Sequence, residues 1–478
     1  MMTGNNFIAG QWVPVERRRE VLSPANTGEV LGSIGLSAPQ AAQEAVTAAR
    51  KAQRGWKAMG MVNRGNLLFQ AAAALEAHLD ELAELATREM GKPISETRGE
   101  AMRAVAILRY YAGEGYRAVG EVIPAANPNA LQYTEREPLG VVAIVTPWNF
   151  PLAIPIWKIA PALIYGNAVV FKPAEWSSLT AVRMVELIGS IFPAGVLNLI
   201  LGLGTEVGEA LVQHPDIDGI SFTGSTGVGS HIAAVATQKG IKYQTEMGGK
   251  NPVIVAADAD LDLAVEATVS GAMRSAGQKC TATSRVIVEE AIHDAFAERL
   301  TARTQSLKLG NPLEPDTYLG PVVSEPQYQK VQHFISVGQQ EGARLLTGDD
   351  GRAGGAPGFY IAPTIFDGVD PGATIAQEEI FGPVVGILSV QSLDEAIQVA
   401  NNIRYGLSAS VFTRSLATAM RFVHEIEAGL VRVNDETAGV ELQAPFGGVK
   451  GSSSHSREQG RAAIEFYTHV KTVSIRAL

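Results

Sequence analysis

Apolar residues recur along the chain with two rhythms, and each rhythm predicts a different architecture. From about Pro39 to Tyr116 the sequence is rich in alanine, with leucines three and four residues apart. That spacing gathers apolar side chains on one face of a helix, so we expect a scaffold of amphipathic helices there. From Val141 onward, short apolar runs alternate with helical segments. They predict strands over Val141–Val145, Ala168–Phe171, Val196–Ile200 and Ile217–Phe222, with helices near 152–165, 177–191, 205–213 and 228–238.

Strands that alternate with helices predict a parallel sheet with crossover helices. A second series of this kind runs through Val253–Ala256, Arg285–Glu289, Thr364–Phe366 and Val384–Val390. We therefore predict an α/β fold class with two doubly wound parallel-sheet α/β domains. Within the second domain, the Gly- and Pro-rich residues 348–358 predict a loop. Between Pro124 and Pro138 the chain leaves the main domain, and Gln132–Arg136 alternates like an exposed strand.

The composition narrows the class of protein. A chain of 478 residues with 46% hydrophobic residues can bury a large core and form two or three domains. Its 39 basic and 49 acidic residues give a net charge of −10 with no long basic run, so we expect neither nucleic acid nor an anionic membrane as a partner. The amino terminus carries no export or transit pattern and no apolar run reaches membrane-spanning length, which predicts a cytoplasmic protein.

The single cysteine, Cys280, cannot form an internal disulfide and suits a reducing compartment. A lone cysteine in an apolar stretch is more often an inert core residue. Its surroundings here favour a reactive thiol instead. Lys279 is adjacent, Gly277 permits the close approach of another group, and the polar neighbours suggest a site that stabilises a thiolate.

Two further polar residues lie at the ends of predicted strands. Glu246 ends the strand-like segment Ile241–Thr245. A lone Glu is usually a solvated charge, but the Gly248-Gly249 pair suggests a carboxylate that swings between positions. Asn149 follows the first strand of the α/β series and is either a turn residue or an amide that donates a hydrogen bond to a tetrahedral oxyanion.

Two more strand ends are suited to a dinucleotide. The run Phe222–Gly229 links a strand to a helix, so its glycines and N–H groups can approach a pyrophosphate, although its spacing departs from Gly-x-Gly-x-x-Gly. Lys172 and Glu175 follow the strand Ala168–Phe171. A carboxylate there can accept both hydroxyls of an adenosine ribose while the lysine donates to one; the alternative is a surface turn.

A series of motifs carries a family resemblance. The motifs are Pro147-Trp148-Asn149-Phe150-Pro151, Lys172-Pro173-Ala174-Glu175, Phe222-Thr223-Gly224-Ser225, Glu246-Met247-Gly248-Gly249-Lys250, Gly277-Gln278-Lys279-Cys280, Glu379-Ile380-Phe381-Gly382-Pro383 and Pro445-Phe446-Gly447-Gly448. In these motifs and their order the chain resembles the aldehyde dehydrogenase superfamily over essentially its whole length. The resemblance implies Cys280 as nucleophile, Glu246 as general base and Asn149 as oxyanion donor. The dinucleotide contacts that it implies are Trp148, Lys172, Glu175, Gly224, Ser225, Gly248, Glu379 and Phe381.

The resemblance also implies the domain organisation and the assembly. Residues 1–122 and 140–246 would form the dinucleotide-binding domain, and residues 247–445 the catalytic domain. Residues 123–139 and 460–478, with a strand near Thr472–Ile475, would form a small β oligomerisation element. We therefore expect a homodimer or homotetramer.

These roles define the expected chemistry. The Cys280 thiolate would attack an aldehyde to give a thiohemiacetal, whose oxyanion Asn149 and the Cys280 N–H would hold. After hydride transfer to the nicotinamide, Glu246 would activate the water that hydrolyses the thioester to a carboxylic acid. No metal is required. NAD is the preferred cofactor, since Glu175 would repel a 2′-phosphate, and some NADP activity is compatible with this interpretation.

One departure from the family pattern bears on the substrate. After Lys450, where many members read Ser-Gly-x-Gly-Arg-Glu, residues 451–460 read Gly-Ser-Ser-Ser-His-Ser-Arg-Glu-Gln-Gly. With residues 441–444 before it, this variant resembles the subgroup that includes 2,5-dioxopentanoate (α-ketoglutaric semialdehyde) dehydrogenases. A distal carboxylate needs a cation, for which Arg117 and Arg274 are candidates unless each is an ordinary surface or ion-paired arginine. Phe150 is the expected aromatic contact with the substrate.

Three alternatives stay open at this point. The substrate can be another semialdehyde, or the enzyme can accept a broad range of aliphatic or aromatic aldehydes. An acylating enzyme would pass the thioester to coenzyme A, and Glu246 argues against it because no water would need activation. A non-enzymatic structural member of the fold is the third alternative, against which Cys280, Glu246 and Asn149 argue together.

Overall fold

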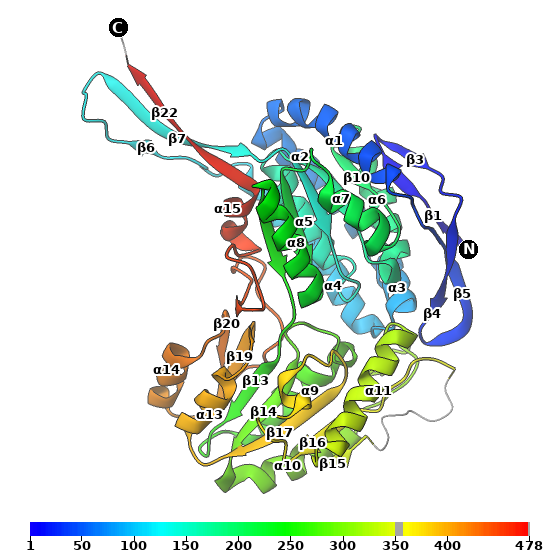
Figure 1. Ribbon diagram of the computed structural model, residues 1–478, viewed down its shortest axis with the longest axis vertical. Helices are drawn as coiled ribbons and strands as arrows, with labels where there is room; N and C mark the ends of the chain where they lie inside the picture. The colour runs from blue at the N-terminus through cyan, green and yellow to red at the C-terminus, as the bar shows by residue number, and fades with distance from the viewer. Residues whose placement is uncertain (349–356, 477–478) are drawn as a thin grey trace.

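Two seven-stranded sheets organise the chain, one in each of two bodies that lie one above the other in Figure 1. The computed structural model describes residues 1–348 and 357–476. The predicted α/β fold class with parallel sheets is confirmed. The expected loop over 348–358 falls mostly on residues 349–356, which lie outside the described residues.

The first sheet lies in the upper body, and five of its strands form its parallel core. In sheet order its strands are β12 (Lys242–Glu246), β11 (Gly219–Thr223), β8 (Val141–Val145), β9 (Ala168–Lys172), β10 (Leu197–Leu199), β2 (Asn6–Ile8) and β3 (Gln11–Val13). The strands from β12 to β10 are parallel, whereas β2 and β3 pair antiparallel at the edge. The four strands predicted between 141 and 222 are β8, β9, β10 and β11, each within two residues of the expected bounds.

Alternate residues of this sheet face two different layers of helices. Val142 and Ile144 of β8 belong to one apolar cluster, and Val141 and Ala143 belong to another. Burying each such valine or isoleucine side chain contributes roughly 1.5–3 kcal/mol, and alanine less, which is why these strands are nearly continuous apolar runs. The first layer holds α2 (Met61–Glu76), α3 (Leu79–Met90), α4 (Ile94–Glu114), α5 (Ala153–Ile164) and α6 (Ser178–Ile188); the second holds α1 (Gln40–Ala58), α7 (Glu209–Gln213) and α8 (Thr226–Lys239).

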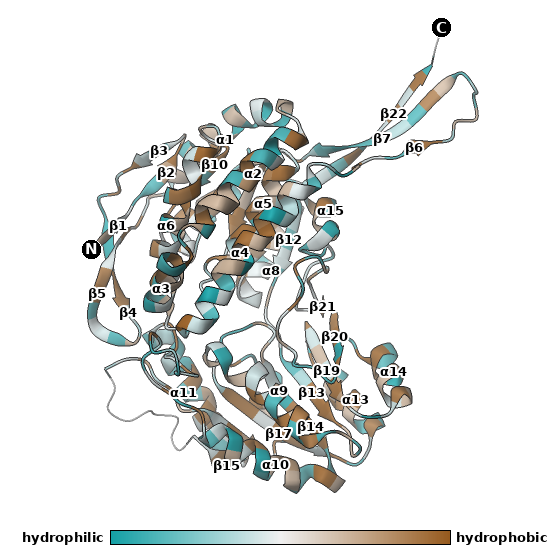
Figure 2. Cartoon of the chain, turned by 180° about the vertical axis from the view of Figure 1, so that it is seen from behind, coloured by the Kyte–Doolittle hydropathy of each residue, from teal (hydrophilic) through white to brown (hydrophobic). Residues whose placement is uncertain are grey.

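The second sheet lies in the lower body and is parallel except for one edge strand, β15. Its strands are largely apolar in Figure 2. In sheet order they are β15 (Arg344–Thr347), β16 (Thr364–Asp367), β17 (Val384–Val390), β14 (Thr283–Glu289), β13 (Asn251–Val255), β19 (Ser408–Phe412) and β20 (Leu430–Val433). The helices around it are α9 (Leu261–Met273), α10 (Glu290–Gln305), α11 (Glu325–Gln340), α12 (Thr374–Gln377), α13 (Leu393–Asn401) and α14 (Leu416–Glu425).

A three-stranded arm projects from the upper body and carries the described carboxyl end of the chain (Figure 1). Strands β7 (Ala130–Pro138) and β22 (Thr468–Arg476) pair antiparallel over their full lengths, and β6 (Val122–Ile123) adds to the other side of β7. They include both strands expected there. The arm exposes apolar side chains, with Val122 at 76% and Val470 at 55% exposure.

Several elements have no counterpart in the sequence prediction. The amino-terminal residues form β1 (Met2–Gly4), β4 (Arg18–Ser23) and β5 (Asn26–Gly35), which make a small sheet of their own. A two-residue pair, β18 (Tyr405–Gly406) with β21 (Val449–Lys450), and the short α15 (Ala463–Tyr467) connect the lower body back to the arm. Within the described ranges, no helix is both long and apolar enough to cross a membrane.

Candidate active site

A cleft between the two bodies brings together most of the predicted site residues. Its volume is about 180 Å³. Of the predicted residues, Trp148, Asn149, Gly224, Ser225, Gly248, Cys280, Glu379 and Phe381 line it. Pro147, Thr223, Met247, Gln327 and Lys330 complete the lining.

A tight turn between α9 and β14 presents Cys280. Ser275, Ala276 and Gly277 all have positive φ, at 55°, 51° and 68°. Side chains other than glycine rarely adopt this conformation, so the turn is strained and its surroundings must hold it in place. A Cβ at Gly277 would lie 2.1 Å from the carbonyl oxygen of Gly382, so this glycine does permit the close approach that the sequence suggested.

The expectation that Lys279 stabilises the Cys280 thiolate is wrong for this structure. The Nζ of Lys279 donates to the carbonyl oxygen of Ser270 at 3.3 Å. The pKa of Cys280 is raised to about 12, mainly by burial and also by the carboxylates of Glu379 and Glu246. The nearby backbone N–H groups lower this pKa by a smaller amount. The thiol is therefore protonated at neutral pH and needs a base before it can attack.

Asn149 is fixed beside the nucleophile. Its side chain is buried, and its Nδ2 donates to the carbonyl oxygen of Gln278 at 3.0 Å. This bond orients the amide toward the backbone that leads into Cys280 and uses only one of its two N–H groups. The second N–H stays available for an oxyanion on a carbon bound to the Cys280 sulfur.

Glu246 is the last residue of β12 and is buried. Its Oε2 accepts a hydrogen bond from the Ser453 hydroxyl, whereas Oε1 has no partner in the described part of the chain. Burial raises the pKa of Glu246 well above its ordinary value, and Glu458 raises it further; Ser453, Lys158 and Arg457 act in the opposite direction. Glu246 is therefore a carboxyl group that holds a proton more strongly than a solvated one.

The glycines after Glu246 lie in close contact with two site residues. A Cβ at Gly248 would lie 2.6 Å from the Glu379 carboxylate, and a Cβ at Gly249 would lie 2.5 Å from the Cys280 carbonyl oxygen. The Gly249 N–H donates to Glu379 at 3.0 Å. The pair thus allows the backbone to pass close to two site residues, and the movement of the Glu246 carboxylate between positions stays a prediction.

A buried ion pair lies behind Glu246. Lys158 of α5 pairs with Glu458, and its Nζ also donates to Ser221 at 3.0 Å. Two serines that follow β21 connect their segment to β12. The Ser453 hydroxyl donates to the Glu246 carboxylate, and the Ser454 N–H donates to the Thr245 carbonyl oxygen. No local motif marks this network, because Glu458 and Ser453 lie 300 and 207 residues after their partners Lys158 and Glu246 and meet them only in the fold.

A second cavity extends the site along the first sheet. Its volume is about 430 Å³, and it is lined by Glu175, Val145, Leu203, Gly227, Val228, His231 and six other residues. Lys172 is not among its lining residues. Its Nζ donates to the Pro173 carbonyl oxygen at 2.6 Å, and burial lowers the pKa of Lys172 to about 8. Of the two predicted ribose contacts, Glu175 therefore faces a cavity, whereas Lys172 is held by backbone.

The start of α8 is suited to an anion. Ser225 is the N-cap residue of α8, yet its side chain accepts no bond from the helix, so the first N–H groups lack that partner. Gly224 and Ser225 line the cleft, and Gly227 lines the second cavity. A pyrophosphate that bridges the two hollows would meet these N–H groups.

Helix α11 contributes two cleft residues that the sequence analysis missed. The Nε2 of Gln327 donates to the carbonyl oxygen of Phe381 at 2.8 Å, and so holds Phe381 at a φ of 60°. The Phe381 ring meets Trp148 edge-on, with centroids 5.5 Å apart. Lys330 lines the same cleft and contributes a positive charge to it. Neither α11 residue stands in a recognisable motif, so the local sequence gave no signal for them.

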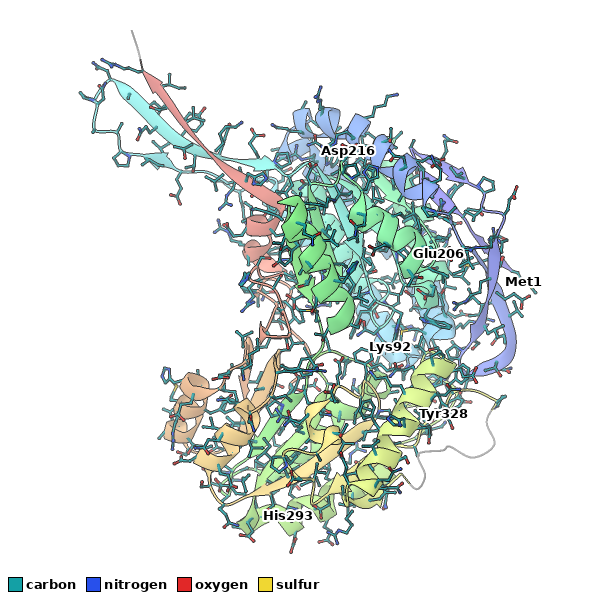
Figure 3. All side chains as sticks on the ribbon, in the orientation of Figure 1. Met1, Lys92, Glu206, Asp216, His293 and Tyr328 are labelled. Atoms are coloured by element: carbon teal, nitrogen blue, oxygen red, sulfur yellow. The ribbon has the colours of Figure 1, made fainter. Side chains whose placement is uncertain are left out.

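The predicted substrate residues lie outside the lining of this cleft. Phe150 packs under Lys92, whose Nζ is 3.7 Å from the ring centroid; Lys92 lies where the two bodies meet (Figure 3). Arg117 is half exposed and pairs with Glu114. Arg274 follows α9, with its guanidinium 5.6 Å from the centre of the Tyr318 ring.

Comparison with known proteins places this arrangement in context. A model of the Aldehyde dehydrogenase family matches residues 12–473. The chain is 49% identical over 476 residues to an alpha-ketoglutaric semialdehyde dehydrogenase of Bacillus subtilis, covering 98% of each chain, and 39% identical over 471 residues to a 2,5-dioxopentanoate dehydrogenase of Saccharolobus solfataricus, with the same coverage. Among solved structures it is similar to an NAD-dependent aldehyde dehydrogenase of Sinorhizobium meliloti, with a TM-score of 0.96, 37% identity, and coverage of 99% of this chain and 95% of that one.

Proposed function

We propose that this chain, which belongs to the aldehyde dehydrogenase family, oxidises 2,5-dioxopentanoate to 2-oxoglutarate with NAD as the hydride acceptor. The observation that carries the proposal is the cleft itself, because Cys280, Asn149 and several residues suited to a dinucleotide line the same cavity. The substrate follows from relatives that are similar over 98% of the chain and carry that activity in their names.

The residues fit a nicotinamide dinucleotide. The second cavity would take the adenosine end with Glu175 near its ribose, and the open N-terminus of α8 would face the pyrophosphate. Glu379 and Phe381 would hold the nicotinamide end beside Cys280. When bound, the dinucleotide supplies the acceptor for the hydride that leaves the aldehyde carbon.

Cys280 and Asn149 would carry the first half of the reaction. The sulfur of Cys280 forms a bond to the aldehyde carbon as its proton passes to a base, and the carbonyl oxygen becomes an oxyanion. The free N–H of Asn149 and the backbone N–H of Cys280 would hold that oxyanion. Loss of hydride from the carbon then leaves a thioester on Cys280.

Glu246 would carry the second half. Water adds to the thioester carbon as its proton passes to Glu246, and the carbon–sulfur bond breaks to release the carboxylic acid and the Cys280 thiol. The raised pKa of Glu246 makes it a stronger base than a solvated carboxylate once it is ionised. Glu246 changes its protonation in a buried setting, whereas Cys280 is partly exposed in the cleft.

We also infer that the chain assembles into a homodimer or homotetramer through the arm. Residues 123–139 and 460–478 would form this element, with 1–122 and 140–246 as the dinucleotide-binding domain and 247–445 as the catalytic domain. The exposed Val122, Leu131, Val470 and Ile475 on the arm support an interface, since they gain by burial. Light scattering after size-exclusion chromatography would test this, and a monomer at micromolar concentration would contradict it.

The activity test is a panel of kcat/KM values with both NAD and NADP. We expect 2,5-dioxopentanoate with NAD to give the highest value, with shorter semialdehydes and uncharged aldehydes below it. A higher value for an aliphatic or aromatic aldehyde would show a broad-range enzyme and would contradict the proposed substrate. Product formation only in the presence of coenzyme A would contradict hydrolysis.

A further inference from the structure

Helix α4 contacts the start of α5 close to Asn149, and the same face of α4 carries a second polar residue, Arg103. Glu100 of α4 accepts the N–H groups of Leu152 and Ala153 at 2.8 and 3.1 Å, just after the Asn149–Phe150 turn. Arg103 lies three residues after Glu100, and residues at that spacing share one face of a helix. Arg103 therefore lies one helical turn along the α4 face that touches the start of α5.

Arg103 is only partly satisfied by the protein. Its Nη2 donates to the carbonyl oxygen of Val440 and to Oε1 of Gln459, the latter at 3.2 Å. Its Nε and Nη1 have no hydrogen-bond acceptor among the described residues, and Arg103 is only partly buried, so both nitrogens are open to solvent or a ligand. Burial lowers the pKa of Arg103, and the carboxylate of Glu441 offsets part of this shift.

Gln459 carries a second unsatisfied donor at the same place. It is 1% exposed, and its Nε2 has no partner among the described residues. A buried donor without an acceptor is energetically unfavourable, so a ligand that accepts a hydrogen bond from it gains by binding there. The backbone of Gln459 also has a φ of 61°, so the surrounding structure holds this residue in a conformation that its type rarely adopts.

A short ladder connects Gln459 to the general base. Glu458 and Phe446 exchange backbone hydrogen bonds of 2.7 and 2.8 Å. Gly447, the next residue after Phe446, lies against Glu246, since a Cβ there would be 3.0 Å from its Oε1. Because this bridge is antiparallel, Arg457 lies opposite Gly447, and Gln459 lies one residue to the other side of the Phe446–Glu458 pair. Gln459 thus joins the segment that contacts Glu246 from the side away from Gly447, and it is not among the residues that line the cleft suited to the dinucleotide.

We propose that Arg103 and the Gln459 amide bind the distal carboxylate of the substrate. The inference rests on the proposed semialdehyde activity and adds the residues that select for it. Nε and Nη1 of Arg103 form the edge of a guanidinium that accepts a carboxylate in a two-pronged contact, and Gln459 Nε2 adds a third donor. The two arginines predicted from sequence are engaged elsewhere, Arg117 with Glu114 and Arg274 with Tyr318.

The test compares two five-carbon aldehydes that differ only at the distal group. 2,5-Dioxopentanoate carries the carboxylate, and 4-oxopentanal carries a methyl group instead. In Arg103→Met we expect kcat/KM for 2,5-dioxopentanoate to fall about 10- to 150-fold, the range for losing hydrogen bonds to a charged group. The value for 4-oxopentanal should stay the same. Arg117→Met is the matched control and should change neither.

The outcomes distinguish failure of the proposed carboxylate anchor, Arg103 with Gln459, from failure of the proposed activity on 2,5-dioxopentanoate. An equal fall for both aldehydes in Arg103→Met would mean that Arg103 only holds the Val440 segment, and would overturn the anchor. A wild-type enzyme that does not prefer 2,5-dioxopentanoate over 4-oxopentanal would overturn the proposed substrate instead. If Arg103→Met does not fold, Gln459→Glu keeps the size of the side chain and adds a repelling charge. It should lower kcat/KM for the carboxylate substrate alone, and an unchanged ratio would overturn the anchor.

Discussion

The two seven-stranded sheets meet the active-site cleft with opposite ends of their strands. In the upper body, Asn149 follows β8, Ser225 follows β11 and Glu246 ends β12, so the carboxyl ends of the strands face the cleft. In the lower body, Cys280 precedes β14 and Glu379 precedes β17, so the amino ends face it. Ligands of doubly wound sheets bind at carboxyl ends as a rule, and only the upper sheet follows that rule.

The two sheet edges contribute different chemical groups to the active site. The carboxyl edge of the upper sheet offers an open helix N-terminus, an amide donor and a buried carboxyl group, which bind and stabilise charge. The amino edge of the lower sheet offers a strained turn that carries a thiol. The upper sheet would therefore hold the adenosine and pyrophosphate parts of a dinucleotide, whereas the covalent step depends on the lower sheet.

The largest expected effect comes from removing the covalent contribution of the lower sheet. In Cys280→Ser we expect oxidation to fall by at least about 10⁴-fold, because a serine hydroxyl has no comparable nucleophilicity without its own base. Dinucleotide binding, followed by NADH fluorescence, should be unchanged. Loss of NADH binding in this variant would show that the two edges do not act separately, and near wild-type turnover would refute the role of the thiol.

Removing the base from the upper sheet should have the next largest effect. In Glu246→Gln we expect steady turnover to fall about 10²- to 10⁴-fold, the usual contribution of a general base. A pre-steady-state burst of NADH should persist, because formation of the thioester precedes the step that Glu246 assists. The exposed Glu84→Gln is the control and should behave as wild type. Loss of the burst would mean that Glu246 also takes the proton of Cys280.

The pH dependence of the steady-state rate also tests the two sheet edges, because Glu246 at the upper edge and Cys280 at the lower edge both have a raised pKa. Burial raises the pKa of Glu246 and that of Cys280, and both act as reactive groups in their deprotonated forms. Steady-state rates should therefore rise with pH from neutral upward, by up to about tenfold per pH unit. In Glu246→Gln the part of this rise that belongs to the carboxyl group should disappear. A rate that is flat or falls between pH 6 and 9 in the wild type would contradict these directions.

The smallest effect concerns the far end of the upper sheet. Glu175 lines the cavity suited to the adenosine ribose, and its charge should disfavour a 2′-phosphate by roughly 1 kcal/mol, about a fivefold effect. Glu175→Ser should raise kcat/KM with NADP relative to NAD by that factor. The charge of Lys172 interacts with Glu175 and would offset part of the repulsion, so some NADP activity is expected in the wild type. An unchanged cofactor ratio would remove Glu175 as the discriminator.

The sequence predicts the upper sheet better than the lower one for a physical reason. Strands β8 to β11 are buried on both faces, so their apolar runs stand out at the expected positions. The amino-terminal strands lack this signal, because β4 and β5 are partly exposed and polar. Strands β19 and β20 also escaped prediction, and β20 is only partly buried.

The site divides in the same way. Residues in contiguous motifs, such as Asn149 and Glu246, can be read from the sequence, whereas Gln327 and Ser453 reach the site through contacts that span the chain. The error over Lys279 has a related cause. Adjacency in sequence does not set the direction of a side chain, and burial and nearby carboxylates govern the pKa of Cys280.

The most direct test of the thioester mechanism is the intact mass of the Glu246→Gln protein after mixing with 2,5-dioxopentanoate and NAD and rapid acid quenching. The chain has one cysteine, so a thioester has a single possible position. We predict one added acyl group per chain, which hydroxylamine removes and which Cys280→Ser never acquires, together with one NADH per added group. NADH formed in the burst without any acyl group on the protein would contradict a covalent intermediate on Cys280.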